Sequence, residues 1–510
     1  MNLTTTVSQA APLAGRPKRL VGSWAARGAL VMVLFSVLGK TAALGSQIAL
    51  AWFLLPRELG VAAVAFSIMN VAAICSGANL RHLLVQRHEH FHREAGQVFW
   101  LALMINLAGG LMLALAAGRI AVWFQEPCLA PLLWVVALAL PILSLTTIYG
   151  AALYAGLKFR TVAMIFCAQG ILQNGGAVCL AMLGFGALSL VLPLIPAYAV
   201  SVVLFRRAAG SVTIGWPDFR TWPAFLKTAI WLMLSSLFIA LQNYGANFVV
   251  GLLQDARVTG LFFWGFTLSF QVAVLLAGNL QGVLFPALTK LTHDVRRLGD
   301  GFDKACQTMM LAVAPVCALQ IVLAPTMIGW VFHERWEPAA PVVQWLTLGT
   351  LTQPLGVMAA SLYLARGQFR RLAALTGGFA AVVVLAAIAG ATLGGETSIA
   401  AWVGGALGVV NLVAGWMAYR SLERGAGQLA RAIAFPFLAG GAVLLIGFAG
   451  LRCAGPWGAI PQVFVVTALV LSCYGFLAWK GVNERVRNLL LVLCPRAMDK
   501  LGLMTTARDQ

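Results

Sequence analysis

Long apolar stretches, separated by short polar or charged breaks, run through most of this chain. A helix that crosses a hydrocarbon core about 30 Å thick needs about 20 apolar residues. Stretches such as "LAALTGGFAAVVVLAAIAGATLGG" do not alternate apolar with polar residues, as the strands of a membrane barrel would. The pattern therefore predicts an all-α integral membrane protein with about 14 transmembrane helices. They are expected near residues 28–55, 59–80, 96–118, 129–153, 161–183, 186–205, 225–253, 258–289, 303–332, 339–365, 370–393, 397–419, 429–451 and 457–479.

A second pattern is an internal repeat. The stretch "LLPRELGVAAVAF" joins the first two predicted spans, and "LLQDARVTGLFFWGF" joins the seventh and eighth in the same way. Further on, "GANLRHLLV" (77–85) corresponds to "AGNLQGVLF" (277–285) at an offset of 200 residues. Both copies run in the same direction through the membrane, so the repeat is parallel. Paired helical lobes with a cleft between them are a transporter architecture.

The repeat and the spans together predict the organisation of the chain. Two pseudo-symmetric lobes of six helices are expected around a central cleft, followed by two C-terminal helices. The predicted parts are a basic cytoplasmic segment (1–27), an N-lobe (28–206), a cytoplasmic linker (207–224), a C-lobe (225–421), helices 13 and 14 (422–480) and an amphipathic cytoplasmic tail (481–510).

Charge supports the span count and gives an orientation. The chain is 61% hydrophobic and only 10% charged, which excludes ordinary soluble domains. Of the 35 Lys and Arg residues, 29 fall on one side of the predicted spans and five on the other, while Lys40 lies within a span. Cytoplasmic loops carry the Lys and Arg excess, so both termini are expected in the cytoplasm. The net charge of +19 indicates contact with anionic membrane lipids and not with nucleic acid.

Five stretches occur in the order expected for a known family: "LAWFLLPRELGVAAVA" (50–65), "LLVQRHEHFHREAGQVFWLALMINL" (83–107), "GLKFRTVAMI" (156–165), "VLFPALTKLTHDVRRLGDGF" (283–302) and "VFHERWEPAAPVVQWLTLGT" (331–350). Together they resemble the bacterial oligosaccharide flippases. These proteins form the polysaccharide-export branch of the multidrug/oligosaccharidyl-lipid/polysaccharide exporter superfamily.

The resemblance implies a 14-helix, two-lobe transporter of the bacterial inner membrane. It implies that the chain moves an undecaprenyl-pyrophosphate-linked oligosaccharide to the periplasmic leaflet for capsule, exopolysaccharide or O-antigen synthesis. No cofactor and no enzymatic activity are then expected. The protein is expected to act as a monomer, with a polysaccharide polymerase complex as a further partner. One departure concerns Ala246 in "NYGANFVVG", which stands where the family often has an Asp. A cation site based on that acid is therefore not available here.

Lys40 is the first candidate for substrate binding. It lies well inside the first predicted span, which contains no acidic residue. A lysine within the membrane is costly and is expected to face a polar interior, where its charge would meet the pyrophosphate. Gln47 follows two helical turns later on nearly the same face. The alternative is a deprotonated Lys40, or one that donates to a backbone carbonyl in a packed interface.

Further candidates are amides within spans and charges at their ends. The cleft set is completed by Asn79, Arg81, Gln242, Asn243, Asn247 and Asn279. For the amides the alternative is hydrogen bonding between helices, and for Arg81 it is an anchor at lipid phosphates. A periplasmic gate could be formed by Arg57, Glu58, Asp255 and Arg257, although local turn capping is the favoured explanation of these charges. No metal site is predicted.

Two other functions remain open from the sequence. A cation-coupled multidrug exporter of the same superfamily would favour an acid in mid-span, and the predicted spans contain none. A membrane polysaccharide polymerase or ligase would need reactive groups on a long periplasmic loop. The predicted loops on that side, such as "LPREL" and "LGGETS", are short.

Overall fold

The computed structural model describes residues 35, 38–75, 91–155, 158–210, 216–217, 222–271, 294–332, 334–453 and 458–481. Within these ranges every regular element is a helix. Residues 38–53 and 256–271 are helical. The other helices are α2 (Pro56–Cys75), α4 (Phe91–Trp123), α5 (Leu129–Ala155), α6 (Phe159–Met182), α7 (Leu188–Val191), α8 (Leu194–Ala209), α9 (Trp222–Leu253), α11 (Val295–Val331), η2 (Glu334–Trp336), α12 (Ala339–Thr350), α13 (Gln353–Ala365), α14 (Phe369–Leu393), α15 (Glu396–Ser421), α16 (Ala426–Cys453) and α17 (Ala459–Gly481).

The helical membrane fold expected from the sequence is confirmed in the described part of the chain. Ten segments there are long and apolar enough to cross a membrane, and each overlaps one predicted span. Three further predicted spans, 28–55, 59–80 and 258–289, run into residues outside the described ranges. The predicted segments 1–27 and 482–510 and the candidates Asn79, Arg81 and Asn279 also lie outside them.

The predicted span 339–365 is two helices and not one. Helix α12 ends at Thr350 and α13 begins at Gln353. Pro354 has no N–H to donate within the first turn of α13, so a continuous helix would lack a hydrogen bond there. The Thr352 hydroxyl instead donates to the carbonyls of Gly349 (3.0 Å) and Gly408 (3.3 Å). Proline and a threonine that bonds the backbone therefore account for the break.

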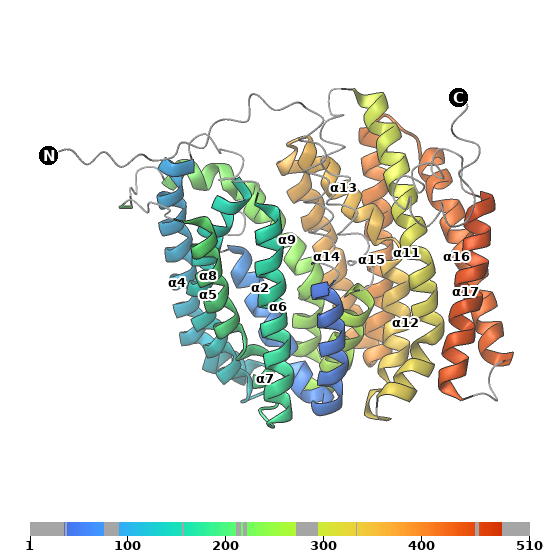
Figure 1. Ribbon diagram of the computed structural model, residues 1–510, viewed down its shortest axis with the longest axis horizontal. Coiled ribbons are helices and arrows are strands. Elements are labelled where there is room, and N and C mark those ends of the chain that lie inside the picture. The colour runs from blue at the N-terminus through green and yellow to red at the C-terminus, as the bar shows by residue number, and fades with distance from the viewer. Residues whose placement is uncertain are drawn as a thin grey trace.

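The helices pack in two groups and a final pair (Figure 1). In the N-half, residues 38–210, α5 packs against α4 and α8, and α6 packs against α8. In the C-half, residues 222–421, α14 packs against α9 and α15, and α12 packs against α11 and α15. Helices α16 and α17 pack against each other and against α11. Helix α2 contacts α9 and so joins the two halves.

The two ends of the bundle differ in charge. At one end, named the basic end, Lys158 Nζ donates to the Ala208 carbonyl and Arg366 donates to the Ser421 carbonyl. Arg424 there forms ion pairs with two aspartates of α11. The opposite end contains η2 and the turns at residues 54–55, 124–128, 183–187, 254–255, 337–338 and 394–395.

The halves meet at the opposite end through two glycines. A Cβ on Gly60 would clash with the Ala256 carbonyl, and a Cβ on Gly260 would clash with the Pro56 carbonyl. The contact is reciprocal, and its members are 200 residues apart. The neighbouring turns follow the same offset, because helices end at residues 53 and 253 and new ones begin at 56 and 256. The repeat predicted from the sequence is therefore present at this junction.

Candidate functional site

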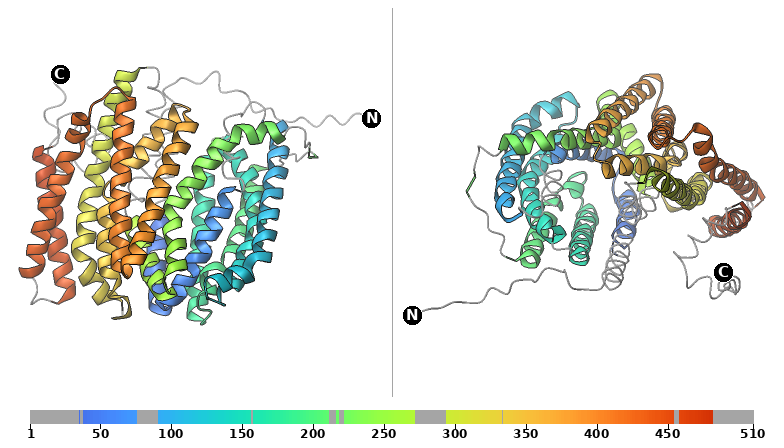
Figure 2. Two further views of the ribbon diagram at one scale, coloured as in Figure 1. Left: turned by 180° about the vertical axis from the view of Figure 1, so that it is seen from behind. Right: turned by 90° about the horizontal axis from the view of Figure 1, so that it is seen from above.

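The helix over residues 38–53 stands between the two halves (Figures 1 and 2). On one side the Ser46 hydroxyl donates to the Asn174 carbonyl of α6 over 3.3 Å. On the other side Trp52 Nε1 donates to the Val331 carbonyl at the end of α11 over 2.8 Å. This first helix is thus in contact with both halves of the transporter-like bundle.

Lys40 and Gln47 share one face of this first helix. Seven residues at 3.6 per turn bring Gln47 almost directly above Lys40. Lys40 is half-buried. The Oε1 atom of Gln47 is buried and accepts no hydrogen bond from a described residue. A buried amide oxygen in that state calls for a donor from outside the described residues, so this face combines a cation with a buried hydrogen-bond acceptor.

The C-terminal end of the first helix is bound by residues of the C-half. The Arg335 guanidinium donates to the carbonyls of Ala51 (3.1 Å) and Trp52 (2.5 Å). Trp336 Nε1 donates to the Ala51 carbonyl over 2.8 Å. The last carbonyls of a helix lack partners within it and carry a partial negative charge, so an arginine suits this position. We name Trp52, Arg335 and Trp336 the clasp.

Aromatic packing fixes the clasp from the C-half side. The fully buried Trp264 ring lies 4.7 Å from both the Trp336 and the Phe332 ring, centroid to centroid. Trp264 Nε1 is buried and donates to no described residue. The indole of Trp336 therefore has a rigid apolar support, while its N–H is directed at the first helix.

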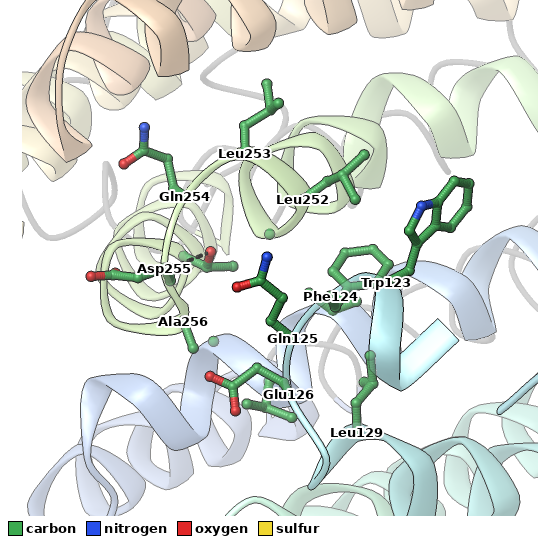
Figure 3. A pocket seen from close by; sticks show the side chains of 15 residues that line it. Trp123, Phe124, Gln125, Glu126, Leu129, Leu252, Leu253, Gln254, Asp255 and Ala256 are labelled. Carbon is green, nitrogen blue, oxygen red and sulfur yellow. Dashed lines mark hydrogen bonds between the residues drawn. The ribbon is translucent and has the colours of Figure 1, made fainter. Parts of the chain in front are cut away.

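A cavity of about 370 Å³ lies at the opposite end, where the two halves meet. Figure 3 shows that the turn after α4 contributes Gln125 and Glu126, and the turn after α9 contributes Asp255. Gly60 and Val64 of α2 complete the wall near the glycine crossing. Polar groups from both halves thus border one space beside the junction.

The four charges predicted as a gate lie near this cavity, but their contacts are mostly local. Arg57 pairs with Glu126 (3.1 Å), and hydrogen bonding to Glu126 followed by its charge raises the pKa of Arg57, with a smaller effect from Asp255. Glu58 accepts from the Leu55 N–H, and Asp255 accepts from the Val258 N–H. Arg257 is exposed. Glu58 and Asp255 therefore cap their own turns, and the gate stays a prediction.

The predicted amides of α9 lie in different surroundings. Gln242 and Asn243 line a cavity of about 130 Å³ between α9, α13, α14 and α15, together with a hydrogen-bonded pair in which Asn411 donates to Gln353 (3.2 Å). Asn247 is buried, and neither of its side-chain polar atoms has a described partner. Gly251, one turn further on its face, packs against Val64 of α2. Asn247 is thus the predicted amide of α9 whose buried polar atoms have no partner among the described residues.

Sequence reasoning missed the clasp. The stretch "HERWEP" predicts only a rigid interfacial turn within a family-like segment, although Arg335 is one of the few basic residues on the sparsely charged side. Its acceptors are backbone carbonyls, which leave no signature in the sequence. The rarity of that arginine was the one available signal.

Residues 49–341 match the family described as polysaccharide biosynthesis protein. The lipopolysaccharide biosynthesis protein WzxC of Escherichia coli is 24% identical over 61% of this chain and 64% of its own length. The succinoglycan biosynthesis transport protein ExoT of Rhizobium meliloti is 28% identical over 62% of this chain and 66% of its own length. The alignments thus span slightly less than two thirds of these relatives.

Among solved structures, the lipid II flippase MurJ in an inward closed conformation has a similar fold. Its TM-score is 0.71 at 14% sequence identity, and the match covers 88% of this chain and 100% of that one. At this identity the likeness establishes the fold alone.

Proposed function

The chain belongs to the family of polysaccharide biosynthesis proteins, and from this membership we propose that it is a flippase of the exporter superfamily. It would move undecaprenyl-pyrophosphate-linked oligosaccharide repeat units from the cytoplasmic to the periplasmic leaflet. The names of the similar proteins, which concern lipopolysaccharide and succinoglycan biosynthesis, support a role in polysaccharide synthesis. The products served would be an exopolysaccharide, a capsule or an O-antigen.

The finer topology belongs to the same proposal. Fourteen helices, arranged as two six-helix lobes and two C-terminal helices, would lie in the bacterial inner membrane with both termini in the cytoplasm. The charge difference between the basic end and the opposite end supports this orientation. The opposite end would then face the periplasm. The protein would act as a monomer, with a polymerase complex receiving the translocated units.

Binding of the headgroup would centre on the first helix. Phosphate oxygens accept hydrogen bonds from cations, and these charge-assisted bonds are the strong ones. Half-buried Lys40 supplies the cation, and Gln47 supplies an acceptor for a sugar hydroxyl on the same face. Asn247 offers a second amide without a described partner at the junction of the halves. Asn79, Arg81 and Asn279 remain further candidates outside the described residues.

Translocation would proceed by alternating access. The clasp and the glycine crossing join the halves at the opposite end, so substrate would enter from the basic end in this state. Release on the other side requires these contacts to part. The single observation that carries the proposal is the first helix, which presents Lys40 and Gln47 while being held by both halves.

The test is complementation of a deletion strain with Lys40 variants. We expect Lys40→Gln to lower polymer export at least tenfold and complete lipid-linked repeat units to accumulate on the cytoplasmic side. Lys40→Arg, which keeps the charge, should retain most export. Lys158→Gln is the matched control, because Lys158 is an exposed lysine at the basic end. Normal export with Lys40→Gln would overturn the assignment of Lys40.

The deletion itself tests the function. Loss of a flippase leaves complete repeat units on the cytoplasmic side. Unpolymerised units that accumulate on the periplasmic side would instead indicate a polymerase and overturn the proposal. A strain with normal polymer but greater sensitivity to cationic drugs would favour a multidrug exporter.

A further inference from the structure

A groove on the outer surface of the C-half, between α14 and α15, contains two arginines at the basic end. It measures about 420 Å³ and is bordered by Arg371 of α14 and by Trp416 and Arg420 of α15. The Arg420 guanidinium lies 5.6 Å from the centroid of the Trp416 ring. A guanidinium on an indole face is held in place by cation–π attraction. The groove thus presents a positioned positive charge beside an aromatic wall.

The charge in this groove has no counter-ion in the described part of the chain. Arg371 contacts the Gln368 side-chain oxygen over 3.4 Å, and neither Arg371 nor Arg420 is paired there with a carboxylate. Arg366 adds a third guanidinium at the rim, where it donates to the Ser421 carbonyl. An anion in the groove would therefore be attracted without displacing an existing ion pair.

The same two helices form a second, apolar groove further from the basic end. It measures about 690 Å³, and small or apolar residues border it. Trp402, Leu385 and Val409 are exposed along it, and Ala389 and Gly405 widen it. An exposed apolar groove of this size between membrane-spanning helices is suited to a hydrocarbon chain.

The two grooves lie in line along one face. On α14 the residues follow helical spacing from Arg371 through Ala374, Gly378 and Val382, and a Cβ on Gly378 or Gly405 would meet open space. The distance from residue 371 to residue 389 is about 27 Å along a helix, more than one leaflet of a core about 30 Å thick. A cationic head and an apolar trough therefore follow one another along the same face of α14 and α15.

We propose that this surface binds an anionic phospholipid from the leaflet at the basic end. The headgroup phosphate would accept hydrogen bonds from Arg371 and Arg420, and an acyl chain would lie in the apolar trough. This site is separate from Lys40 and the first helix, and it does not depend on the substrate that the protein transports. Its position on α14 and α15 means that bound lipid would brace the packing of these two helices.

The experiment uses the full-length protein, delipidated in detergent, with native mass spectrometry of phosphatidylglycerol and phosphatidylcholine of equal chain length. We expect phosphatidylglycerol to bind more tightly than phosphatidylcholine. Arg371→Gln/Arg420→Gln should weaken its binding by about tenfold or more, because both arginines attract the anionic headgroup. Both residues are exposed, so the variant should fold. Thermal unfolding without lipid checks this.

Two controls make the result specific. Arg207→Gln/Arg431→Gln removes the same charge from exposed positions at the basic end and should change the affinity less than twofold. Gly405→Leu fills the trough while leaving the arginines intact, and it should also weaken the binding of phosphatidylglycerol. Equal losses in the two arginine pairs would overturn the proposal in favour of diffuse attraction. Equally tight binding of glycerol 3-phosphate would indicate a site for free anions and overturn the proposal. Displacement of phosphatidylglycerol by undecaprenyl pyrophosphate alone would assign the groove to the transported lipid and would also overturn it.

Discussion

Two turns at the opposite end have the same backbone course and different anchors. In each, a helix ends at residue 53 or 253, the chain bends, and a new helix begins at 56 or 256. The first turn is held by the clasp, in which Arg335 and Trp336 of the C-half bind the carbonyls of Ala51 and Trp52. The second turn is held within its own half, because Gln254 donates to the Ala391 carbonyl of α14 over 2.7 Å.

This difference shows where the two halves can separate. Motion that opens the opposite end must break the clasp and the glycine crossing, whereas the bond from Gln254 to α14 can persist. The two turns of the repeat therefore share a backbone course, but their side-chain contacts differ. The first helix, which carries Lys40, is therefore the element that the clasp binds to the C-half.

The largest effect should come from the crossing that both turns share. In Gly60→Ala or Gly260→Ala the new methyl collides with a backbone carbonyl, which cannot rotate away. Overpacking typically costs about 1–3 kcal/mol, and more where the neighbouring atom belongs to the backbone and cannot give way, as here. This cost exceeds the roughly 1 kcal/mol that alanine gains over glycine in a helix. We expect both variants to lower the thermal unfolding temperature in detergent by similar amounts, since the contact is reciprocal.

Gly45→Ala is the matched control for that crossing. Gly45 lies in the first helix, and a Cβ there meets no atom within 4 Å. This variant should unfold at the wild-type temperature or above it. If Gly60→Ala were as stable as Gly45→Ala, the halves would not be in contact at Gly60.

The second-largest effect should distinguish the first turn, which the clasp holds, from the second turn, which Gln254 holds. Arg335→Gln removes charge-assisted hydrogen bonds to two helix-end carbonyls, worth about 1.5–3 kcal/mol for bonds to charged groups. The ratio of closed to open molecules should fall about tenfold or more. Ala51 is fully buried beneath the clasp. An Ala51→Cys reporter, in a background without the exposed Cys128, Cys179 and Cys453, therefore measures opening through its labelling by a membrane-impermeant maleimide. Labelling should rise strongly in Arg335→Gln.

Gln254→Ala, in the same reporter background, provides the comparison. It removes the bond to Ala391 within the C-half and should leave labelling within about twofold of the parent. Equal increases in the two variants would mean that both turns open together, and the asymmetry between them would have no role in access.

A smaller effect distinguishes two tryptophans that are in ring contact. Trp336→Phe and Trp264→Phe delete the same atoms from buried rings, but only the Trp336 N–H has an acceptor among the described residues. The difference between the two variants should therefore isolate one hydrogen bond, about 1 kcal/mol. Thermal unfolding should show the larger decrease for Trp336→Phe. A larger decrease for Trp264→Phe would mean that ring packing, and not this hydrogen bond, stabilises the clasp.

The sequence predicts the elements of this fold better than its contacts. Apolar runs predict spans because a helix in lipid must be apolar over its whole length, and all ten spans identified in the described residues were expected. The break at 351–352 was missed although Pro354 marks it. The repeat in the sequence shows the offset of 200 residues. It does not show that Gly60 and Gly260 are in contact at the junction of the halves.

The site is less predictable for a physical reason. Lys40 stands out because a charge in an apolar run is costly, and Gln47 follows from helical periodicity. The clasp joins residues 284 positions apart, and its acceptors are carbonyls that every residue possesses. Likewise, the sequence does not separate Gln242 and Asn243 from Asn247, because only the packing of α9 shows that the first two line a cavity while the polar atoms of Asn247 are buried without a described partner.

The smallest effect concerns the exposed charges predicted as a gate. Arg57 is 68% exposed and its partner Glu126 is 15% exposed, so water and salt weaken their attraction. We expect Arg57→Gln and Glu126→Gln to unfold close to the wild-type temperature and to support near-normal polymer export. The measurement is complementation alongside Arg335→Gln, which should impair export. If Arg57→Gln abolished export while Arg335→Gln preserved it, access would be controlled by the surface charges, and the clasp would be a packing contact only.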